Sequence, residues 1–304
     1  MDKLGIVILN YNGINYTKEC VRSFLSIEIK IDFEIIIVDN NSVIKEKEQL
    51  IKFGKEYNCN VLLNDINLGY AAGNNVGIKY AIKNGCNYIC ILNNDTIIEE
   101  DFFSKCVSFI QSNTDVAFVG PIILNDTDDF VQSTGGNVSL LLGKNSIINM
   151  GEKRSTIKKN IECDYVGGAC IIVDSDYIIS NGDIPEAYFL FFEESEWCYK
   201  AKKKGYRNVI LSDCTIRHKG SVSIKKTEGL SEYMYERNLA LFVKRNSSNK
   251  IELVIFVLIH SLVILERIFR YGVRYCRQFT YMIDGLCSRV SDRFPFIYVN
   301  EDGE

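Results

Sequence analysis

The sequence predicts an α/β fold in which a mostly parallel, Rossmann-like sheet is flanked by helices. Apolar runs of strand length alternate with segments of helical spacing through the first third of the chain. Such alternation is typical of strand–helix–strand units with right-handed crossovers. Each apolar run also ends abruptly in polar side chains, and ligands of these sheets collect at the carboxyl ends of the strands. We therefore expect a functional edge made by the residues that follow the strands.

Four strands are predicted in this part of the chain, each followed by a polar cluster and then by a helix or a turn. The strands and their clusters are 6–9 before Asn10-Tyr11-Asn12-Gly13, 33–38 before Asp39-Asn40-Asn41-Ser42, 61–63 before the glycine-rich stretch 67–75, and 88–92 before Asn93-Asn94-Asp95.

The residue types at this edge suit a nucleotide. Asp39 and the asparagines near it can hydrogen-bond a base or ribose hydroxyls, and Tyr11 offers a flat face to the base. Asp95 can hold a divalent cation shared with a substrate diphosphate, because magnesium and manganese favour oxygen ligands. An Asx-turn after the strand is an equal alternative for Asp95 taken alone. Gly69 and Gly73 allow a ligand to approach the backbone, or they serve an ordinary helix start.

Composition and motifs exclude several classes of protein. A net charge of −4, from 35 Lys+Arg and 39 Asp+Glu, argues against a nucleic-acid partner. The stretch 67–75 carries neither a Walker loop nor the dinucleotide fingerprint, which argues against an ATPase or a dehydrogenase. The 11 cysteines form no Cys-x-x-Cys pair and indicate reduced core residues of a cytosolic protein.

An acidic cluster in the second half of the chain suits a general base. Apolar and aromatic residues at 188–192 directly precede Glu193 and Glu194. Apolar surroundings and a neighbouring carboxylate both disfavour ionisation, which turns a weak acid into a usable base. Acidic residues also stabilise helix N-termini, and for Glu196 we expect that role. His218, one of two histidines, either reaches a metal from its loop or stays exposed to solvent.

Two further stretches lie in the middle of the chain. Gly167 and Gly168 lie in a predicted strand over 165–173, where they admit a ligand to the backbone or form a β-bulge. Residues 126–151 are polar with weak patterning, so we expect an irregular segment with little order that lies over a cleft.

Together these segments resemble family 2 glycosyltransferases of the GT-A fold, and the rhamnosyltransferase-like branch in particular. The resemblance covers about residues 3–245 and also includes 166–169, 191–198, Gly205-Tyr206 and His218-Lys219-Gly220-Ser221-Val222-Ser223. It implies an inverting, metal-assisted transferase that moves a sugar from a nucleoside-diphosphate sugar to a hydroxyl of a lipid-linked or cell-surface polysaccharide acceptor. The branch suggests dTDP-rhamnose as the donor, with UDP-sugars next. A nucleotide-sugar-binding protein without turnover, or a nucleotidylyltransferase-like enzyme, stays open as the alternative function.

The resemblance also implies roles for individual residues. Asp95 and His218 would bind Mg²⁺ or Mn²⁺, although Asn93 stands at the first acidic place of the family's Asp-x-Asp motif. Glu194 would be the general base, with Glu193 as the fallback. The implied nucleotide contacts are Asn10, Tyr11, Asn12, Asp39, Asn67, Gly69, Gly73, Asn74 and Asn94. The implied donor or acceptor contacts are Asn93, Gly167, Gly168, Trp197 and Arg237.

The last part of the chain differs in character. At 304 residues the sequence suits a catalytic domain over 1–245 and a helical segment over 246–304 that associates with a membrane or forms a homo-oligomer. Residues 253–265 are strongly apolar, and Arg267, Arg270, Arg274 and Arg277 follow at nearly helical intervals. The run is short for a span of about 20 apolar residues. We expect an interfacial helix on an anionic membrane, and thus a cytoplasmic protein peripheral at its inner face; helices packed on the catalytic domain are the alternative.

Overall fold

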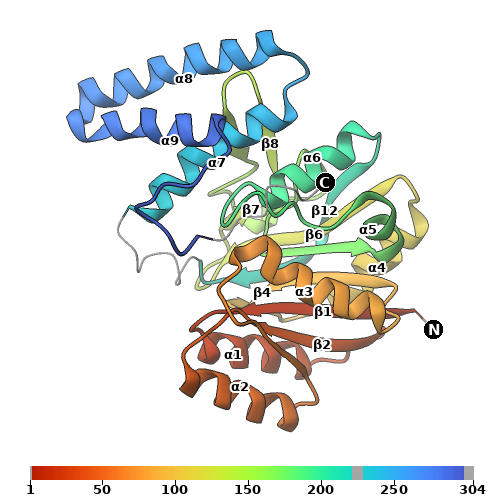
Figure 1. Ribbon diagram of the computed structural model, residues 1–304. Coiled ribbons are helices and arrows are strands. Elements are labelled where there is room, and N and C mark those ends of the chain that lie inside the picture. Colours follow the sequence, from red (N-terminus) through yellow and green to blue (C-terminus); the bar gives the residue numbers. More distant parts are fainter. Residues whose placement is uncertain (1, 221–228, 298–304) are drawn as a thin grey trace.

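Residues 2–220 and 229–297 are described by the computed structural model, and in them one large sheet is covered by helices on both faces (Figure 1). The strand order is β10-β12-β6-β11-β4-β1-β2-β3, with β5 beside β12 and β7 beside β6. Pairings among β1, β2, β3 and β4 are parallel, as is that of β6 with β12, whereas β11 is antiparallel to β4 and β6. The predicted α/β fold with a mostly parallel sheet is confirmed.

The strands of the described residues are β1 (Lys3–Asn10), β2 (Asp32–Asp39), β3 (Asn60–Leu63), β4 (Tyr88–Asn93), β5 (Thr96–Ile97), β6 (Val116–Asn125), β7 (Val131–Ser133), β8 (Gly136–Ser139), β9 (Lys144–Ile147), β10 (Ile161–Cys163), β11 (Cys170–Asp174) and β12 (Arg207–His218). The helices are α1 (Ile14–Leu25), α2 (Ile44–Glu56), α3 (Gly69–Lys83), α4 (Phe102–Ser112), η1 (Arg154–Thr156), α5 (Ser175–Asn181), α6 (Glu193–Lys203), α7 (Leu230–Asn246), α8 (Lys250–Tyr271), η3 (Val273–Cys276) and α9 (Arg277–Leu286).

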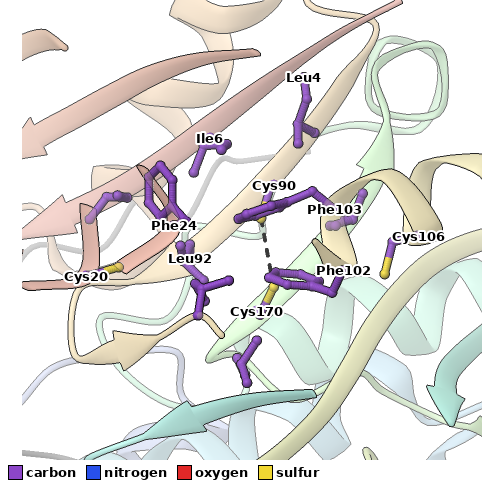
Figure 2. Packing of buried hydrophobic residues seen from close by; sticks show 14 of the residues in the cluster. Leu4, Ile6, Cys20, Phe24, Cys90, Leu92, Phe102, Phe103, Cys106 and Cys170 are labelled. Atoms are coloured by element: carbon purple, nitrogen blue, oxygen red, sulfur yellow. Dashed lines mark hydrogen bonds between the residues drawn. The ribbon is translucent and has the colours of Figure 1, made fainter. Parts of the chain in front are cut away.

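The sheet has a separate apolar core on each face. Helices α1, α2 and α4 cover one face, and α3, α5 and α6 cover the other. Successive residues of β4 point into different cores. Cys90 lies in the core under α1, α2 and α4, and Ile91 lies in the core under α3, α5 and α6. Figure 2 shows the first core, where the Sγ atoms of Cys90 and Cys170 lie 3.8 Å apart. Both cysteines are free and buried, as the sequence predicts.

Glycines bring α3 close to the sheet. A Cβ atom on Gly73 would lie 2.7 Å from Leu9 Cδ1, and one on Gly77 would clash with Val7. Both glycines belong to the helix itself, which begins at Gly69. The glycine-rich stretch 67–75 is therefore mostly helix, and Gly73 within it serves helix–sheet packing.

Residues 126–151 are more ordered than predicted. β7 joins the main sheet, and β8 and β9 form an antiparallel hairpin. The expectation of little order is wrong because the hairpin is fixed from outside: Val138 N donates to Asp164 Oδ2 at 2.7 Å, and Gly136 N donates to Tyr165 O at 3.0 Å. Local patterning could not reveal such distant partners.

The C-terminal helices pack on the sheet domain through α7 and on each other (Figure 1). Helices α7 and α9 cross so closely that a Cβ on Gly285 would clash with Arg237 O. Phe256 and Ile264 of α8 share a buried cluster with Tyr188 and Phe192, which precede α6. The predicted boundary between a catalytic domain and a C-terminal helical segment, at residues 245 and 246, falls at the end of α7. This boundary stays a prediction. Every helix within the described ranges falls short of the length and apolar character needed to cross a membrane.

Candidate active site

Parallel pairing brings the predicted strand ends together at one edge. Asn10 lies opposite Asp39 in the register of β1 and β2, and Leu9 lies opposite Asn93 in that of β1 and β4. The polar clusters after these strands are thus neighbours in space, as expected from the sequence.

Asn10 and Asp39 form a buried network. Asn10 Nδ2 donates to Asp39 Oδ1 at 2.9 Å and to Ser42 Oγ at 3.1 Å, while Thr17 Oγ1 donates to Asn10 Oδ1 at 2.7 Å. Ser42 N donates to Asp39 Oδ2 at 2.9 Å, and Asn12 N donates to Ser42 Oγ at 2.8 Å. Asn10 and Asp39 are both 0% exposed. These two residues fix the turns after β1 and β2. Direct contact of Asn10 or Asp39 with a nucleotide stays a prediction, and it requires these turns to move.

A second amide network holds the entry to α3. Asn67 Oδ1 accepts hydrogen bonds from Asn40 Nδ2 at 2.8 Å and from Gly69 N at 3.0 Å. Gly69 has φ +78°, and a Cβ there would lie 2.5 Å from Phe189 O. Position 69 therefore requires glycine, because the backbone there is left-handed and because Phe189 passes too close for a Cβ atom. The predicted approach of a ligand to the backbone of Gly69 and Gly73 stays a prediction, and on the Cβ side of both glycines protein atoms already occupy the space.

Two more of the predicted nucleotide contacts are engaged in local structure. Asn74 is 1% exposed within α3 and donates through Nδ2 to Tyr70 O at 2.9 Å, so a packing role replaces the predicted one. Asn94 Nδ2 donates to Thr17 Oγ1 at 3.0 Å, which ties the end of β4 to α1. Asn93 lies at that strand end, partly exposed, and its N donates to Ala169 O at 2.9 Å.

A cavity of about 460 Å³ opens beside Tyr11, which is 40% exposed. Its size is that of an ordinary small-molecule site. The residues that line it are Tyr11, Asn41, Ile66, Asn67, Pro295, Phe296 and Ile297. Tyr11 and Asn67 lie where the sequence placed the nucleotide. The three C-terminal residues were not predicted, because nothing in their local pattern indicates a site.

Asp95 and His218 come together as predicted. Antiparallel pairing of β5 and β12 sets His218 opposite Thr96, and His218 Nε2 lies 3.1 Å from Asp95 Oδ1 without the angles of a hydrogen bond. Residues Ser221, Val222 and Ser223 of the same motif lie outside the described residues.

Gln132 of β7 orients the imidazole, a contact that the sequence did not indicate. Gln132 Oε1 lies 2.6 Å from His218 Nδ1 and can only accept, so Nδ1 carries a proton. In the neutral ring the Nε2 lone pair then faces the Asp95 carboxylate, and either a proton or a cation must lie between them.

These two residues fit a divalent cation. Adjacent ligands of an octahedral ion at about 2.1 Å lie about 3 Å apart, close to the observed 3.1 Å. Among the described residues no three His, Cys, Asp or Glu side chains gather into a metal site. A substrate diphosphate would therefore have to complete the coordination, and the cation stays a prediction.

Glu193 and Glu194 begin α6 after two residues in left-handed backbone, Phe191 with φ 71° and Phe192 with φ 75°. Such strain persists only where surrounding structure fixes it, and it often marks functional sites. Each glutamate has an Oε2 atom that is buried and has no hydrogen-bond partner among the described residues. Burial raises the pKa of Glu194, and burial together with the Glu194 charge raises the pKa of Glu193 well above its usual value.

Glu194 is the more accessible of the two glutamates. Glu193 is 2% exposed, whereas Glu194 is partly exposed and lies against Gly168, where a Cβ would come within 3.0 Å of its Oε1. Tyr70 Oη donates to Gly168 O at 2.6 Å and so fixes the turn before β11. A Cβ on Gly167 would instead lie 3.0 Å from Ile123, so Gly167 serves packing rather than the predicted contact.

The loop before Glu193 is held by α7. Arg237 is 1% exposed and donates through Nη1 to Ala187 O at 2.8 Å. Asn238 Nδ2 donates to Leu190 O at 2.7 Å and to Phe191 O at 3.1 Å. The contact of Arg237 with the donor stays a prediction, and in the structure its guanidinium is buried against the chain. The pair supports the backbone that positions the two glutamates.

Two neighbours of the acidic pair are structural. Glu196 is 0% exposed and binds Arg245 Nε at 3.0 Å, Lys200 Nζ at 2.7 Å and the Tyr188 hydroxyl. Trp197 is 3% exposed, packs on Phe118 and donates through Nε1 to Gly182 O at 3.0 Å. The predicted donor or acceptor contact of Trp197 is wrong, since its ring belongs to the core under the sheet.

Comparison with known proteins agrees with this geometry. The model of glycosyl transferase family 2 matches residues 5–179. Over 218 residues the chain is 24% identical to the low-salt glycan biosynthesis hexosyltransferase of Haloferax volcanii, covering 71% of this chain and 66% of that protein. Over 245 residues it is 24% identical to the dTDP-rhamnosyl transferase RfbF of Shigella flexneri, covering 76% and 78%.

Solved structures show the same fold. The structure of S. aureus TarS 1-349 aligns with a TM-score of 0.57 at 17% identity, over 93% of this chain and 81% of that one. That of GalNAc-T7 with UDP, GalNAc and Mn²⁺ aligns with a TM-score of 0.61 at 13% identity, over 89% and 58%. At such low identity the likeness establishes the GT-A fold and no more.

Proposed function

Because this chain belongs to glycosyl transferase family 2, a family of glycosyltransferase enzymes, we propose that it transfers a sugar from a nucleoside-diphosphate sugar to an acceptor hydroxyl with inversion at the anomeric carbon. The observation that carries this proposal is Glu194, a partly exposed carboxyl with a raised pKa beside the turn before β11. A carboxylate of raised basicity that an acceptor can reach is what a general base requires.

In the proposed reaction Glu194 takes the proton of the acceptor hydroxyl as that oxygen bonds to the anomeric carbon. The bond from the anomeric carbon to the diphosphate oxygen breaks on the opposite side, so one displacement inverts the configuration. Asp95 and His218 would hold a divalent cation, Mg²⁺ or Mn²⁺, which when bound offsets the charge of the leaving diphosphate. Arg237 and Asn238 keep the Glu194 loop in place.

We propose dTDP-rhamnose as the first donor to test and UDP-sugars as the next. The similarity to the dTDP-rhamnosyl transferase of Shigella flexneri supports the first, and the structures of TarS with UDP and UDP-GlcNAc support the second. A glycan acceptor, lipid-linked or on a surface polysaccharide, is supported by the similarity to a glycan biosynthesis hexosyltransferase.

A thermal-shift screen of nucleoside diphosphates and their sugars, with and without manganese, tests the function. Ligands that bind only the folded chain raise Tm, so we expect stabilisation by dTDP or UDP compounds. The best sugar nucleotide should then release its nucleoside diphosphate when a glycan acceptor is added. If no nucleotide stabilises the chain and none is consumed, the proposed function fails.

Asn238→Ala is expected to reduce turnover by a larger factor than it reduces nucleoside-diphosphate affinity. The change frees two carbonyl groups of the Glu194 loop, which costs about 1–3 kcal/mol of stability and loosens the base. Steady-state kinetics, calorimetric titration and thermal unfolding measure the three effects. Asn84→Ala is a matched control, because Asn84 Nδ2 caps only a carbonyl of its own helix, Tyr80 O at 2.8 Å. Equal turnover in the two variants would remove Asn238 from positioning the loop.

We further propose that the protein is cytoplasmic and binds the inner face of the cell membrane through α8. One face of this helix presents apolar side chains at spacings of three and four residues, all more than half exposed: Ile251, Val254, Leu258, Leu262, Leu265 and Phe269. Arg270 and Arg274 lie at its exposed end. An apolar face with basic residues beside it suits an anionic membrane surface.

The sequence predicted four arginines on one interfacial helix, but the structure does not place all four on one exposed face. Arg267 binds the buried Glu236 on α7, and Arg277 Nη2 lies 2.5 Å from Glu232 Oε2. Helix α8 also ends at Tyr271, before Gly272 with φ 101°. The helical spacing therefore breaks after Arg270, because Gly272 turns the chain back toward α7.

Combined Leu258→Glu and Leu262→Glu should lower binding to vesicles of anionic lipid by at least about tenfold, since two apolar side chains would no longer enter the membrane. Vesicle co-sedimentation measures this effect. Ile179→Glu on α5 is the control, because Ile179 is also exposed, at 66%. Unchanged sedimentation together with a smaller particle in size-exclusion chromatography would instead identify the face as a contact between two copies.

A further inference from the structure

The cavity beside Tyr11 has a wall from the far end of the chain. Pro295, Phe296 and Ile297 line it together with residues of the loops that follow β1, β2 and β3. These two walls are almost 230 residues apart in sequence, and helices α7 to α9 carry the second one to the sheet edge. The cavity therefore exists only when the C-terminal helices are docked.

The C-terminal wall is anchored by hydrogen bonds and aromatic packing. Phe294 is 3% exposed and its ring lies 5.0 Å from that of Tyr233 on α7. Ser291 N donates to Tyr233 Oη at 2.6 Å, and Ile297 N donates to Phe294 O at 3.1 Å. Residues 291–297 thus form a supported turn rather than a loose end.

Phe296 lies on the exposed part of this turn. It is 50% exposed, and Pro295 before it is also exposed, whereas Phe294 and Ile297 of the same turn are buried. Its ring meets Phe189 edge to face, with centroids 6.5 Å apart and planes at 70°. Phe189 in turn contacts Gly69 and accepts a hydrogen bond from Tyr70 N at 2.8 Å. An exposed aromatic ring is therefore held in the cavity wall by the same loop that leads to Glu194.

The chemistry of the lining indicates what the cavity takes. None of its seven residues carries a charge, so the cavity suits neither a diphosphate nor a metal. It offers two aromatic rings, Tyr11 and Phe296, and two amide side chains, Asn41 and Asn67. Aromatic rings favour the flat face of a base, and amides can hydrogen-bond its edge.

The base of the donor is expected beside Tyr11, and we propose that Phe296, in the C-terminal wall of the same cavity, is a further residue that contacts it. This role deepens the proposed function and rests on it, since it assumes a nucleoside-diphosphate donor. It makes the C-terminal helices part of the donor site, in addition to any contact that α8 makes with a membrane. Base contact through an aromatic face also admits either uracil or thymine.

Phe296→Ala in the full chain tests the proposal. Loss of an aromatic contact to a base should weaken binding of UDP and dTDP by roughly 5- to 150-fold. Binding of inorganic pyrophosphate, which lacks a base, should stay unchanged. Phe296→Tyr keeps the ring and should restore most of the affinity. Tyr271→Ala removes an exposed aromatic side chain at the end of α8 that does not line the cavity, and it should leave nucleotide affinity unaltered.

Calorimetric titration separates the possible outcomes. If wild type binds UDP or dTDP and Phe296→Ala binds them equally well, the base site lies elsewhere and the inference is wrong. If Phe296→Ala weakens pyrophosphate as much as UDP, Phe296 supports the fold of the site and does not contact the base. If wild type binds no nucleoside diphosphate at all, the proposed function fails.

Discussion

Asp95→Asn is expected to lower kcat/KM by about 10³-fold and to abolish the manganese-dependent part of nucleoside-diphosphate binding. Asp95 is the only anionic side chain in the Asn93-Asn94-Asp95 motif, and its Oδ1 lies 3.1 Å from His218 Nε2. An amide has the same shape but cannot supply the charge that a divalent cation on a diphosphate requires. Calorimetric titration of UDP and dTDP with and without manganese measures the binding effect, and steady-state kinetics measures the rate.

The matched control is Asp176→Asn, at an exposed position on α5. It should keep both activity and the manganese response. A manganese response of equal size in Asp95→Asn and wild type would show that the cation, if there is one, is held without Asp95. His218→Ala should weaken the manganese response in the same direction, because the imidazole would be the second protein ligand.

Glu194→Gln is expected to lose about 10² to 10⁴ in turnover with little change in donor affinity. The amide keeps the shape of the side chain beside Gly168 but cannot accept the proton of the acceptor. Glu193→Gln is the control, because Glu193 is the neighbouring buried glutamate but is only 2% exposed and so is less accessible to an acceptor. An inactive Glu193→Gln beside a near-normal Glu194→Gln would move the base by one residue. Full activity in both variants would exclude this pair from proton transfer.

The pH profile gives a second readout for the same base. Burial raises the pKa of Glu194 above its ordinary 4.5, and only the ionised form accepts a proton. Turnover should therefore fall as the pH drops through the raised pKa, at values where an exposed glutamate would still be ionised. Residual activity of Glu194→Gln should lack this acidic limb. A wild-type limb centred at or below 4.5 would contradict the raised pKa.

The same shift affects stability with a defined sign. Between 4.5 and its raised pKa the folded chain keeps a proton on Glu194 that the unfolded chain releases. The free energy of unfolding should therefore decrease as the pH rises through this window. Glu194→Gln should flatten that part of the stability curve.

Local pattern and topology were enough to predict the fold and the edge where the site lies. The strands before Asn10, Asp39 and Asp95 are apolar on both faces, so they had to be interior strands of a helix-covered sheet. Parallel strands bring their carboxyl ends to one edge, which is why these polar clusters meet. The apolar run before Glu193 likewise indicated a carboxyl pair held away from water.

Tertiary structure alone decided which of these side chains face a ligand. Asn10 and Asp39 turn inward because each satisfies a partner across neighbouring strands, and Arg237 turns inward to hold the Ala187 carbonyl. Gln132 reaches His218 because β7 pairs with β6 and β6 pairs with β12, the strand that carries the histidine. Phe296 lines the cavity because α7 and α9 carry it there. Such directions depend on partners far apart in sequence, whereas hydrophobic periodicity reports only on which face of its own element a residue lies.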